Sequence, residues 1–196
     1  DLAAAEPTRL LSLLNCDPDE HLAELLAKAG KAVGATKNEA EAMRLLRRMK
    51  AEAALLIALA DIGGVWPVMR ATRALTEVAD TAIAAAVRFL LRDAAARGRL
   101  EPADPAKPEA GSGHIVLAMG KMGAFELNYS SDIDLIVFYA PDAPALADKD
   151  DATAFHVRIA RDLPRVSVDA LQVEQVIINL LRNSAEALTD AGRHDG

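Results

Sequence analysis

Two aspartates one residue apart, Asp132 and Asp134, are the clearest chemical feature of the chain, and they open an apolar run that is typical of a β-strand. Side chains two apart on a strand point to the same side, so both carboxylates are expected to face one point. Paired carboxylates repel each other at neutral pH, and a bound divalent cation relieves this repulsion. The pair therefore predicts a Mg²⁺ site, because Mg²⁺ prefers oxygen ligands and is commonly held by one or two carboxylates with substrate phosphates.

A bare Asp-x-Asp is common, and by itself it more often marks a solvated turn or strand end. The surrounding residues favour the metal site: an apolar strand is predicted over 115–119, Gly120 interrupts it, and a Gly/Asn/Ser-rich loop leads to the acidic pair. The Gly-Lys dipeptide at 120–121 is not a P-loop, since no glycine stands five residues earlier and Met122 occupies the Ser/Thr position. We therefore expect a glycine turn between two strands, the second of which opens with the acidic pair.

This order of strand, glycine turn, loop and paired acids resembles the DNA polymerase β-like nucleotidyltransferases. Residues 119–136 are similar, in addition, to the signature of the bifunctional glutamine synthetase adenylyltransferase/adenylyl-removing enzymes. The Glu-Leu-Asn at 126–128 resembles the amino-terminal, adenylyl-removing half of that family more than the adenylylating half. Residues 44–64 are similar to the helical lead-in of the same half, so the resemblance spans about 35–163.

The resemblance implies a Mg²⁺-dependent enzyme that removes AMP from a tyrosine of glutamine synthetase by phosphorolysis and releases ADP. Asp132 and Asp134 would be the catalytic, metal-binding residues. The implied nucleotide-binding residues are Gly120, Lys121, Ser130 and Ser131. The implied partners are glutamine synthetase, ADP or ATP with phosphate, and the PII signalling protein.

A different resemblance begins at about residue 164 and continues to about 190. This part is similar to the N-box of sensor histidine kinases, where Asn179 and Asn183 would share one helix face and help to hold Mg²⁺-ATP. Two asparagines on an amphipathic helix are more commonly surface or cap residues. No string resembling the family strand with the third metal-binding carboxylate is found, and Asp169 is an open alternative for that ligand. We therefore expect a junction of two incomplete pieces with little or no turnover.

Composition predicts a mainly helical protein, because much of the 52% hydrophobic content of its 196 residues is alanine. The formal net charge of -7 argues against a general nucleic-acid or anionic-membrane binder. Cys16 is the only cysteine, so an intrachain disulfide is excluded, which is consistent with a reducing cytoplasm. With no long uncharged apolar run, the protein is expected to be soluble and cytoplasmic.

Apolar spacing predicts helices over 8–15, 20–29, 39–62, 68–97 and 151–161. Gly30 and Gly34 are expected to end the second helix. Trp66 is expected to be a core anchor and His156 a surface or half-buried residue; His21, His114 and His194 show no zinc-like spacing with each other or with Cys16.

The predicted fold class is α+β, mainly α. It comprises a helical region over 1–100, an extended and exposed Pro/Gly linker over 101–113, a truncated polymerase-β-like nucleotidyltransferase core over 114–163, and a kinase-like C-terminal helix within 164–196. Two other functions stay open: a non-catalytic helical scaffold or binding fragment, and an ATP-binding remnant of a histidine kinase.

Overall fold

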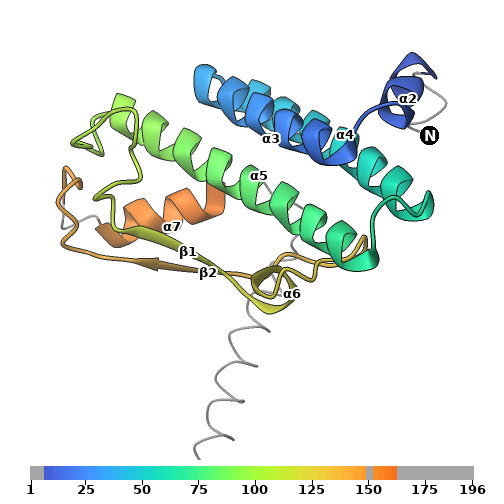
Figure 1. Cartoon of the computed structure of the whole chain (residues 1–196). Helices are drawn as coiled ribbons and strands as arrows, with labels where there is room; N and C mark the ends of the chain where they lie inside the picture. The colour runs from blue at the N-terminus through green and yellow to red at the C-terminus, as the bar shows by residue number, and fades with distance from the viewer. Residues whose placement is uncertain (1–6, 149–151, 163–196) are drawn as a thin grey trace, which may run out of the picture.

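The computed structural model describes residues 7–148 and 152–162 (Figure 1). Four helices come first: α2 (Pro7–Leu14), α3 (Pro18–Ala35), α4 (Glu39–Ile62) and α5 (Val68–Ala96). They are followed by strand β1 (His114–Ala118), the one-turn helix α6 (Gly120–Gly123), strand β2 (Leu135–Tyr139) and helix α7 (Ala152–Asp162). The described part is thus mainly helical with one small antiparallel sheet, which confirms the predicted mainly-α class. The polymerase-β-like core stays a prediction.

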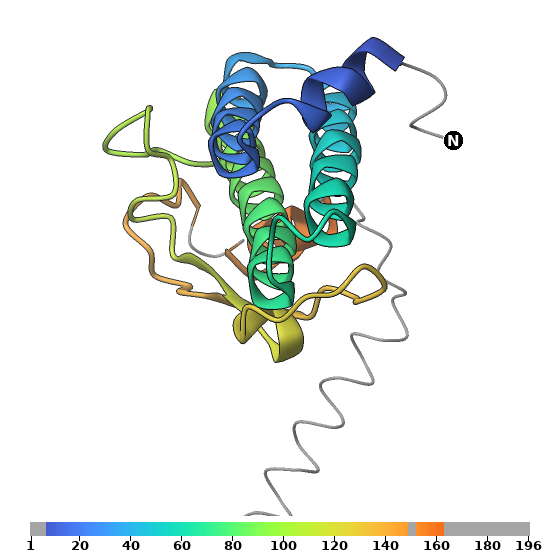
Figure 2. The same ribbon diagram turned by 45° about the vertical axis from the view of Figure 1, so that its right-hand side comes forward.

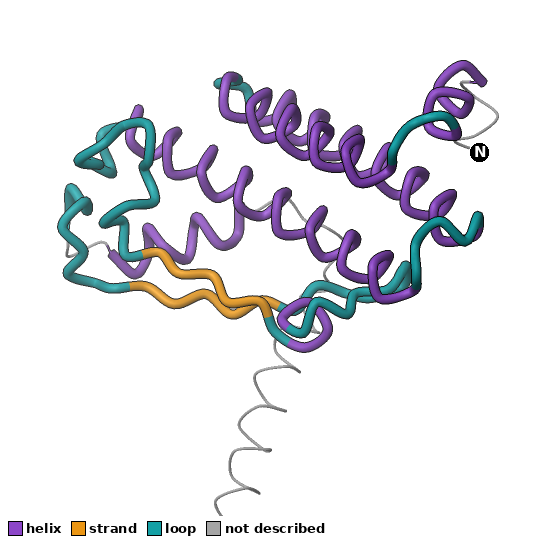
Figure 3. The backbone as a smooth tube through the Cα atoms, in the orientation of Figure 1, coloured by secondary structure: helices purple, strands orange, loops and turns teal. Residues whose placement is uncertain are grey.

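Helix α5 is the central element of this arrangement. Helices α3 and α4 pack on one side of it, and the β1–β2 hairpin and α7 lie on the other (Figures 1 and 2). Many buried positions of α5 are alanines, whose small side chains allow neighbouring backbones to approach closely. The two strands run side by side below α5, with α6 at the turn between them (Figure 3).

Local capping explains where the helices begin. Asp17 precedes Pro18 and accepts hydrogen bonds from the backbone N–H groups of Asp19 and Glu20, which fixes the start of α3. Asn38 caps α4 in the same way through the N–H of Glu41. The helices predicted over 39–62, 68–97 and 151–161 are confirmed to within one residue.

The break predicted at Gly30 and Gly34 is wrong, because α3 continues through both glycines to Ala35. Ala29 and Val33 lie on the buried face of this stretch and keep it packed on the core. This tertiary packing outweighs the cost of a helical glycine, about 1 kcal/mol relative to alanine.

The segment over 101–113 is largely exposed, but the expectation of an extended linker is wrong. Pro108 and Ser112 are buried, and Glu109 forms an ion pair with Arg88 of α5. The N–H of Glu101 donates to the carbonyl of Ala145, 2.7 Å away. Turns therefore fold the segment back onto α5 and onto the loop that follows β2.

One cluster of buried apolar residues extends from α3 and α4 through α5 to α7, where it includes Phe155 and Ile159. Trp66 belongs to this cluster, which confirms its prediction as a core anchor. No helix in the described ranges is long and apolar enough to cross a membrane. Asp169, Asn179 and Asn183 lie outside the described residues, as does the predicted C-terminal helix.

Candidate functional site

Asp132 and Asp134 lie just before β2, which begins at Leu135, so the prediction that the pair opens the strand is wrong. The hydrogen-bonded ladder nevertheless reaches Asp134, because its carbonyl accepts from the N–H of Met119 at 2.9 Å. Asp134 is thereby held beside the end of β1, where the chain turns at Gly120.

The glycine turn and Asp134 are in direct proximity. Gly120 has a φ of +53°, and a Cβ atom at this position would lie only 3.1 Å from Oδ2 of Asp134. A positive φ and a close approach both favour glycine over any other residue. The structure therefore brings together two of the residues that the sequence predicts for one site.

A small apolar cluster orients the acidic segment. Met122 and Leu127 are buried against Ala79 of α5, and Ile133 packs on this cluster from between the two aspartates. With Ile133 turned inward, Asp132 is exposed and Asp134 is half-buried. The residue between the acids thus anchors them while their carboxylates stay accessible.

The donor chemistry of the pair fits a hard divalent cation. Neither carboxylate has a hydrogen bond or ion pair to another residue in the described ranges, so their oxygens remain available. No group of three His, Cys, Asp or Glu side chains suited to a metal occurs in the described part of the chain. Two carboxylates are sufficient for Mg²⁺ when phosphates and water complete its coordination.

Asn128 organises the loop that precedes the acids. Its Oδ1 accepts from the Ser130 N–H at 3.0 Å, from Ser130 Oγ at 3.1 Å and from Ser131 Oγ at 2.8 Å. Ser131 Oγ in turn accepts from the Asn128 N–H at 3.0 Å. The two serines predicted to bind nucleotide therefore donate their hydroxyl protons within the loop, and Asn128 is a structural residue that the sequence reasoning missed. An Asn followed by Ser two and three residues later is the signal that indicates such a turn.

Two contacts fasten the same loop to the helices. The Tyr129 hydroxyl donates to Asp61 Oδ2 at the end of α4, 3.0 Å away. Partial desolvation of this hydroxyl, together with the hydrogen bond, raises the pKa of Tyr129 to about 12, although most of this residue is exposed. The Arg73 guanidinium of α5 lies 5.6 Å from the centre of the Phe125 ring, and Phe125 has a φ of 59°. Lys121 is exposed on α6, immediately after Gly120.

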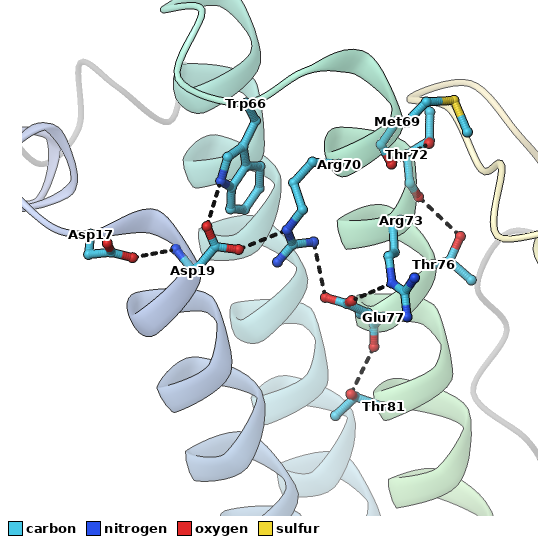
Figure 4. Close-up of polar contacts among 10 residues, drawn as sticks. All are labelled: Asp17, Asp19, Trp66, Met69, Arg70, Thr72, Arg73, Thr76, Glu77 and Thr81. Atoms are coloured by element: carbon cyan, nitrogen blue, oxygen red, sulfur yellow. Dashed lines mark hydrogen bonds and ion pairs between the residues drawn. The ribbon is translucent and has the colours of Figure 1, made fainter.

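A separate polar network joins α3 to the turn between α4 and α5 (Figure 4). Asp19 accepts from Trp66 Nε1 at 3.0 Å and from Arg70 Nε at 2.8 Å, and the bond from Arg70 holds the Asp19 pKa below its ordinary value. Arg70 also lies 4.4 Å from the Trp66 ring centre and pairs with Glu77. Because these charges are mutually satisfied, we assign the network a structural role.

The histidines form a cluster that the sequence reasoning did not foresee. His156 is 1% exposed, which corrects the expected surface or half-buried position, and its Nδ1 lies 3.1 Å from Nδ1 of His114. Tyr139 stacks on His156 with ring centroids 4.9 Å apart. His114 begins β1 and Tyr139 ends β2, so this cluster lies at the opposite end of the hairpin from the acids.

The sequence model of one protein family, glutamate-ammonia ligase adenylyltransferase, matches residues 1–172. The chain belongs to this family. The match begins before and ends after the stretch over 35–163 for which the resemblance was predicted. Comparison with this family gives no support to the predicted histidine-kinase segment.

Curated relatives carry the name bifunctional glutamine synthetase adenylyltransferase/adenylyl-removing enzyme. The protein from Bradyrhizobium diazoefficiens is 63% identical over 166 residues, which cover 85% of this chain and 17% of the relative. Those from Rhodopseudomonas palustris (strain BisB5) and Xanthobacter autotrophicus are 57% and 55% identical over the same coverage. The chain thus spans about 17% of the length of these family members.

Proposed function

We propose that this chain contributes the first two metal-binding carboxylates and the phosphate-facing turn of an adenylyl-removing nucleotidyltransferase. The observation that carries the proposal is the position of Asp134 over Gly120, with Asp132 two residues away and neither carboxylate neutralised by a described partner. Membership of the adenylyltransferase family supplies the reaction class. The substrate, adenylylated glutamine synthetase, is taken from the name of the relatives.

In the proposed reaction, an oxygen of inorganic phosphate attacks the phosphorus of the adenylyl group on tyrosine. The new P–O bond makes ADP, the bond to the tyrosine oxygen breaks, and the released phenolate takes up one proton. Bound Mg²⁺ supplies positive charge at the phosphoryl oxygens.

The residues of the chain have separate roles in this proposal. Asp132 and Asp134 would hold the cation, Gly120 lets phosphates approach the backbone, and Lys121 adds a point charge. Ser130 and Ser131 shape the loop through Asn128, so donation to a nucleotide would first require those hydrogen bonds to open.

A thermal-shift titration with Mn²⁺ and ADP tests the site. We expect the ligands to raise the melting temperature of the wild-type chain, because binding to the native state stabilises it. The double variant Asp132→Asn/Asp134→Asn should lose this shift, whereas Asp142→Asn, which changes an exposed aspartate beyond β2, should keep it. No shift in the wild type would instead favour the non-catalytic scaffold.

We also propose that this chain turns over slowly or not at all, since the family strand with the third carboxylate is not recognised in its sequence. Rapid Mg²⁺-dependent release of ADP from adenylylated glutamine synthetase by the purified chain would contradict this part of the proposal. The contact with PII stays a prediction.

A further inference from the structure

Large apolar side chains are exposed where the α4–α5 turn meets the loop before β2. We name this surface the apolar corner, and it consists of Ile62, Val65, Val68, Met69, Phe125 and Tyr129. Ile62 is 88% and Met69 64% exposed. Contiguous exposed apolar surface of this kind commonly marks a protein-interaction site.

The two halves of the apolar corner are joined by direct contacts. Tyr129 donates to Asp61, the residue before Ile62, and Arg73, one helical turn after Met69, lies over the Phe125 ring. In the view of Figure 4, the Met69 side chain extends toward the pale yellow loop. Segments more than fifty residues apart in sequence therefore form one surface.

The framework beneath the apolar corner is well ordered by hydrogen bonds. The N–H groups of Val65 and Trp66 both donate to the Ala60 carbonyl, at 2.9 and 3.0 Å. Trp66 is buried, and it contacts Asp19 and Arg70 (Figure 4). Its neighbour Val65 is exposed. A preorganised surface loses less conformational entropy on binding than a flexible one.

We propose that the apolar corner is the surface on which the folded protein substrate docks, so that its adenylylated side chain reaches Asp132 and Asp134. This inference rests on the proposed function. Its support is continuity with the site, since Tyr129 belongs to the same Asn128-closed loop that leads to Asp132. When the nucleotide of an adenylylated protein occupies the site, the protein surface around the modified residue contacts the residues next to Asp132 and Asp134.

The composition of the apolar corner is consistent with a protein partner. Tyr, Phe, Met and Arg are enriched at protein interfaces, and all four occur here, with Arg73 at the rim. The net charge of -7 does not favour nucleic acid or an anionic membrane. We commit to the folded protein substrate as the occupant, because the apolar corner continues into the loop that leads to Asp132.

Binding of purified adenylylated glutamine synthetase to the immobilised chain tests this proposal. The variant Val65→Asp/Met69→Asp should bind at least ten-fold more weakly, because charges are placed in the apolar centre of the interface. The matched control Leu11→Asp/Leu14→Asp changes two residues of α2 with similar exposure, 60% and 58%, and should bind as the wild type does. Equal binding by the corner variant and the wild type would overturn the proposal.

Three further readouts separate this inference from the proposed function. The corner variant should retain the melting-temperature shift with Mn²⁺ and ADP, and Asp132→Asn/Asp134→Asn should retain binding to glutamine synthetase. A wild-type chain that shows the ligand shift but no glutamine synthetase binding overturns the docking surface and leaves the proposed function intact. Sedimentation velocity supplies the third readout: a wild-type dimer that the corner variant converts to a monomer would assign this surface to self-association and overturn the proposal.

Discussion

At the scale of single residues, Gly120 and Asp134 constrain each other. The positive φ of Gly120 turns the chain out of β1, and the missing side chain leaves room for the Asp134 carboxylate at 3.1 Å from the Cβ position. Asp134 is itself fixed by its carbonyl, which accepts from Met119. The turn and the carboxylate are therefore one unit, and the chemistry assigned to Asp134 depends on the glycine.

Replacing Gly120 with alanine should impair this unit in two ways. The backbone strain of a positive φ should lower the free energy of unfolding by about 1–2 kcal/mol. The added methyl group should also displace the Asp134 carboxylate and weaken binding of Mn²⁺ with ADP roughly ten-fold. Urea unfolding and the thermal-shift titration measure the two effects.

Gly98→Ala is the matched control, because Gly98 has a similar φ of +71° but no atom within 4 Å of its Cβ position. It should lose comparable stability and keep ligand binding. Loss of ligand binding in both variants, or in neither, would show that the contact between position 120 and Asp134 does not determine the binding of Mn²⁺ with ADP.

At the scale of elements, α7 is joined to the hairpin by the contact between buried His156 and half-buried His114. The two Nδ1 atoms lie 3.1 Å apart and the ring centroids 5.3 Å apart. This centroid separation is close to the maximum that such a nitrogen contact allows. The two nitrogens therefore face each other almost directly. One Nδ1 must carry the proton and the other must accept it. A pair with both rings protonated would direct two N–H groups at each other, so this contact requires at least one neutral ring.

Acid should therefore destabilise the chain through these histidines. Burial, with a smaller contribution from His156, lowers the pKa of His114 to about 4, and burial also lowers the pKa of His156. In the unfolded chain both titrate near their ordinary pKa of about 6.5, so the unfolded state binds more protons than the folded state as the pH falls below this value. The contribution of His114 should be complete above pH 7 and should fall as the pH drops from about 6.5 toward 4, by at most about 1.4 kcal/mol per pH unit. His156 should add a loss of stability in the same direction, because its pKa is also lowered by burial.

Urea midpoints at pH 4.5–7.5 provide the measurement. The variant His114→Leu/His156→Leu should show a much flatter pH profile, because neither position can then bind a proton. His21→Asn removes a partly exposed histidine near Glu52 and is the control. Its urea midpoint should change with pH as steeply as that of the wild type. If the urea midpoint of the leucine variant falls with pH as steeply as that of the wild type, groups other than these two histidines cause the loss of stability in acid.

At the scale of the whole molecule, what the sequence predicted correctly was local. Apolar spacing within single segments predicted the helices over 39–62, 68–97 and 151–161 to within one residue, since such spacing depends only on neighbours along the chain. The contacts that were missed join distant segments: His114 to His156, 42 residues apart, and Asp61 to Tyr129, 68 apart. Such pairs depend on how the helices pack, which short-range spacing does not specify.

The continuous core makes a prediction about cooperativity. Phe155 of α7 and Trp66 belong to one buried cluster, although the sequence analysis assigns them to different regions. Phe155→Ala should lower the free energy of unfolding by about 3–5 kcal/mol through the cavity it creates. If the described part unfolds as one unit, the fluorescence of Trp66, the only tryptophan, should report the same decrease as circular dichroism.

Val157→Ala is the control for a change within α7, because Val157 lies on the exposed side of this helix. This substitution should lower the free energy of unfolding by less than about 1 kcal/mol. A Trp66 transition that is unaffected by Phe155→Ala would mean that the helical region over 1–100 unfolds independently of the hairpin and α7. Coincident transitions would instead mean that the helices, the hairpin and the acidic site form one cooperative unit, so that damage to the core under α7 also reaches Asp132 and Asp134.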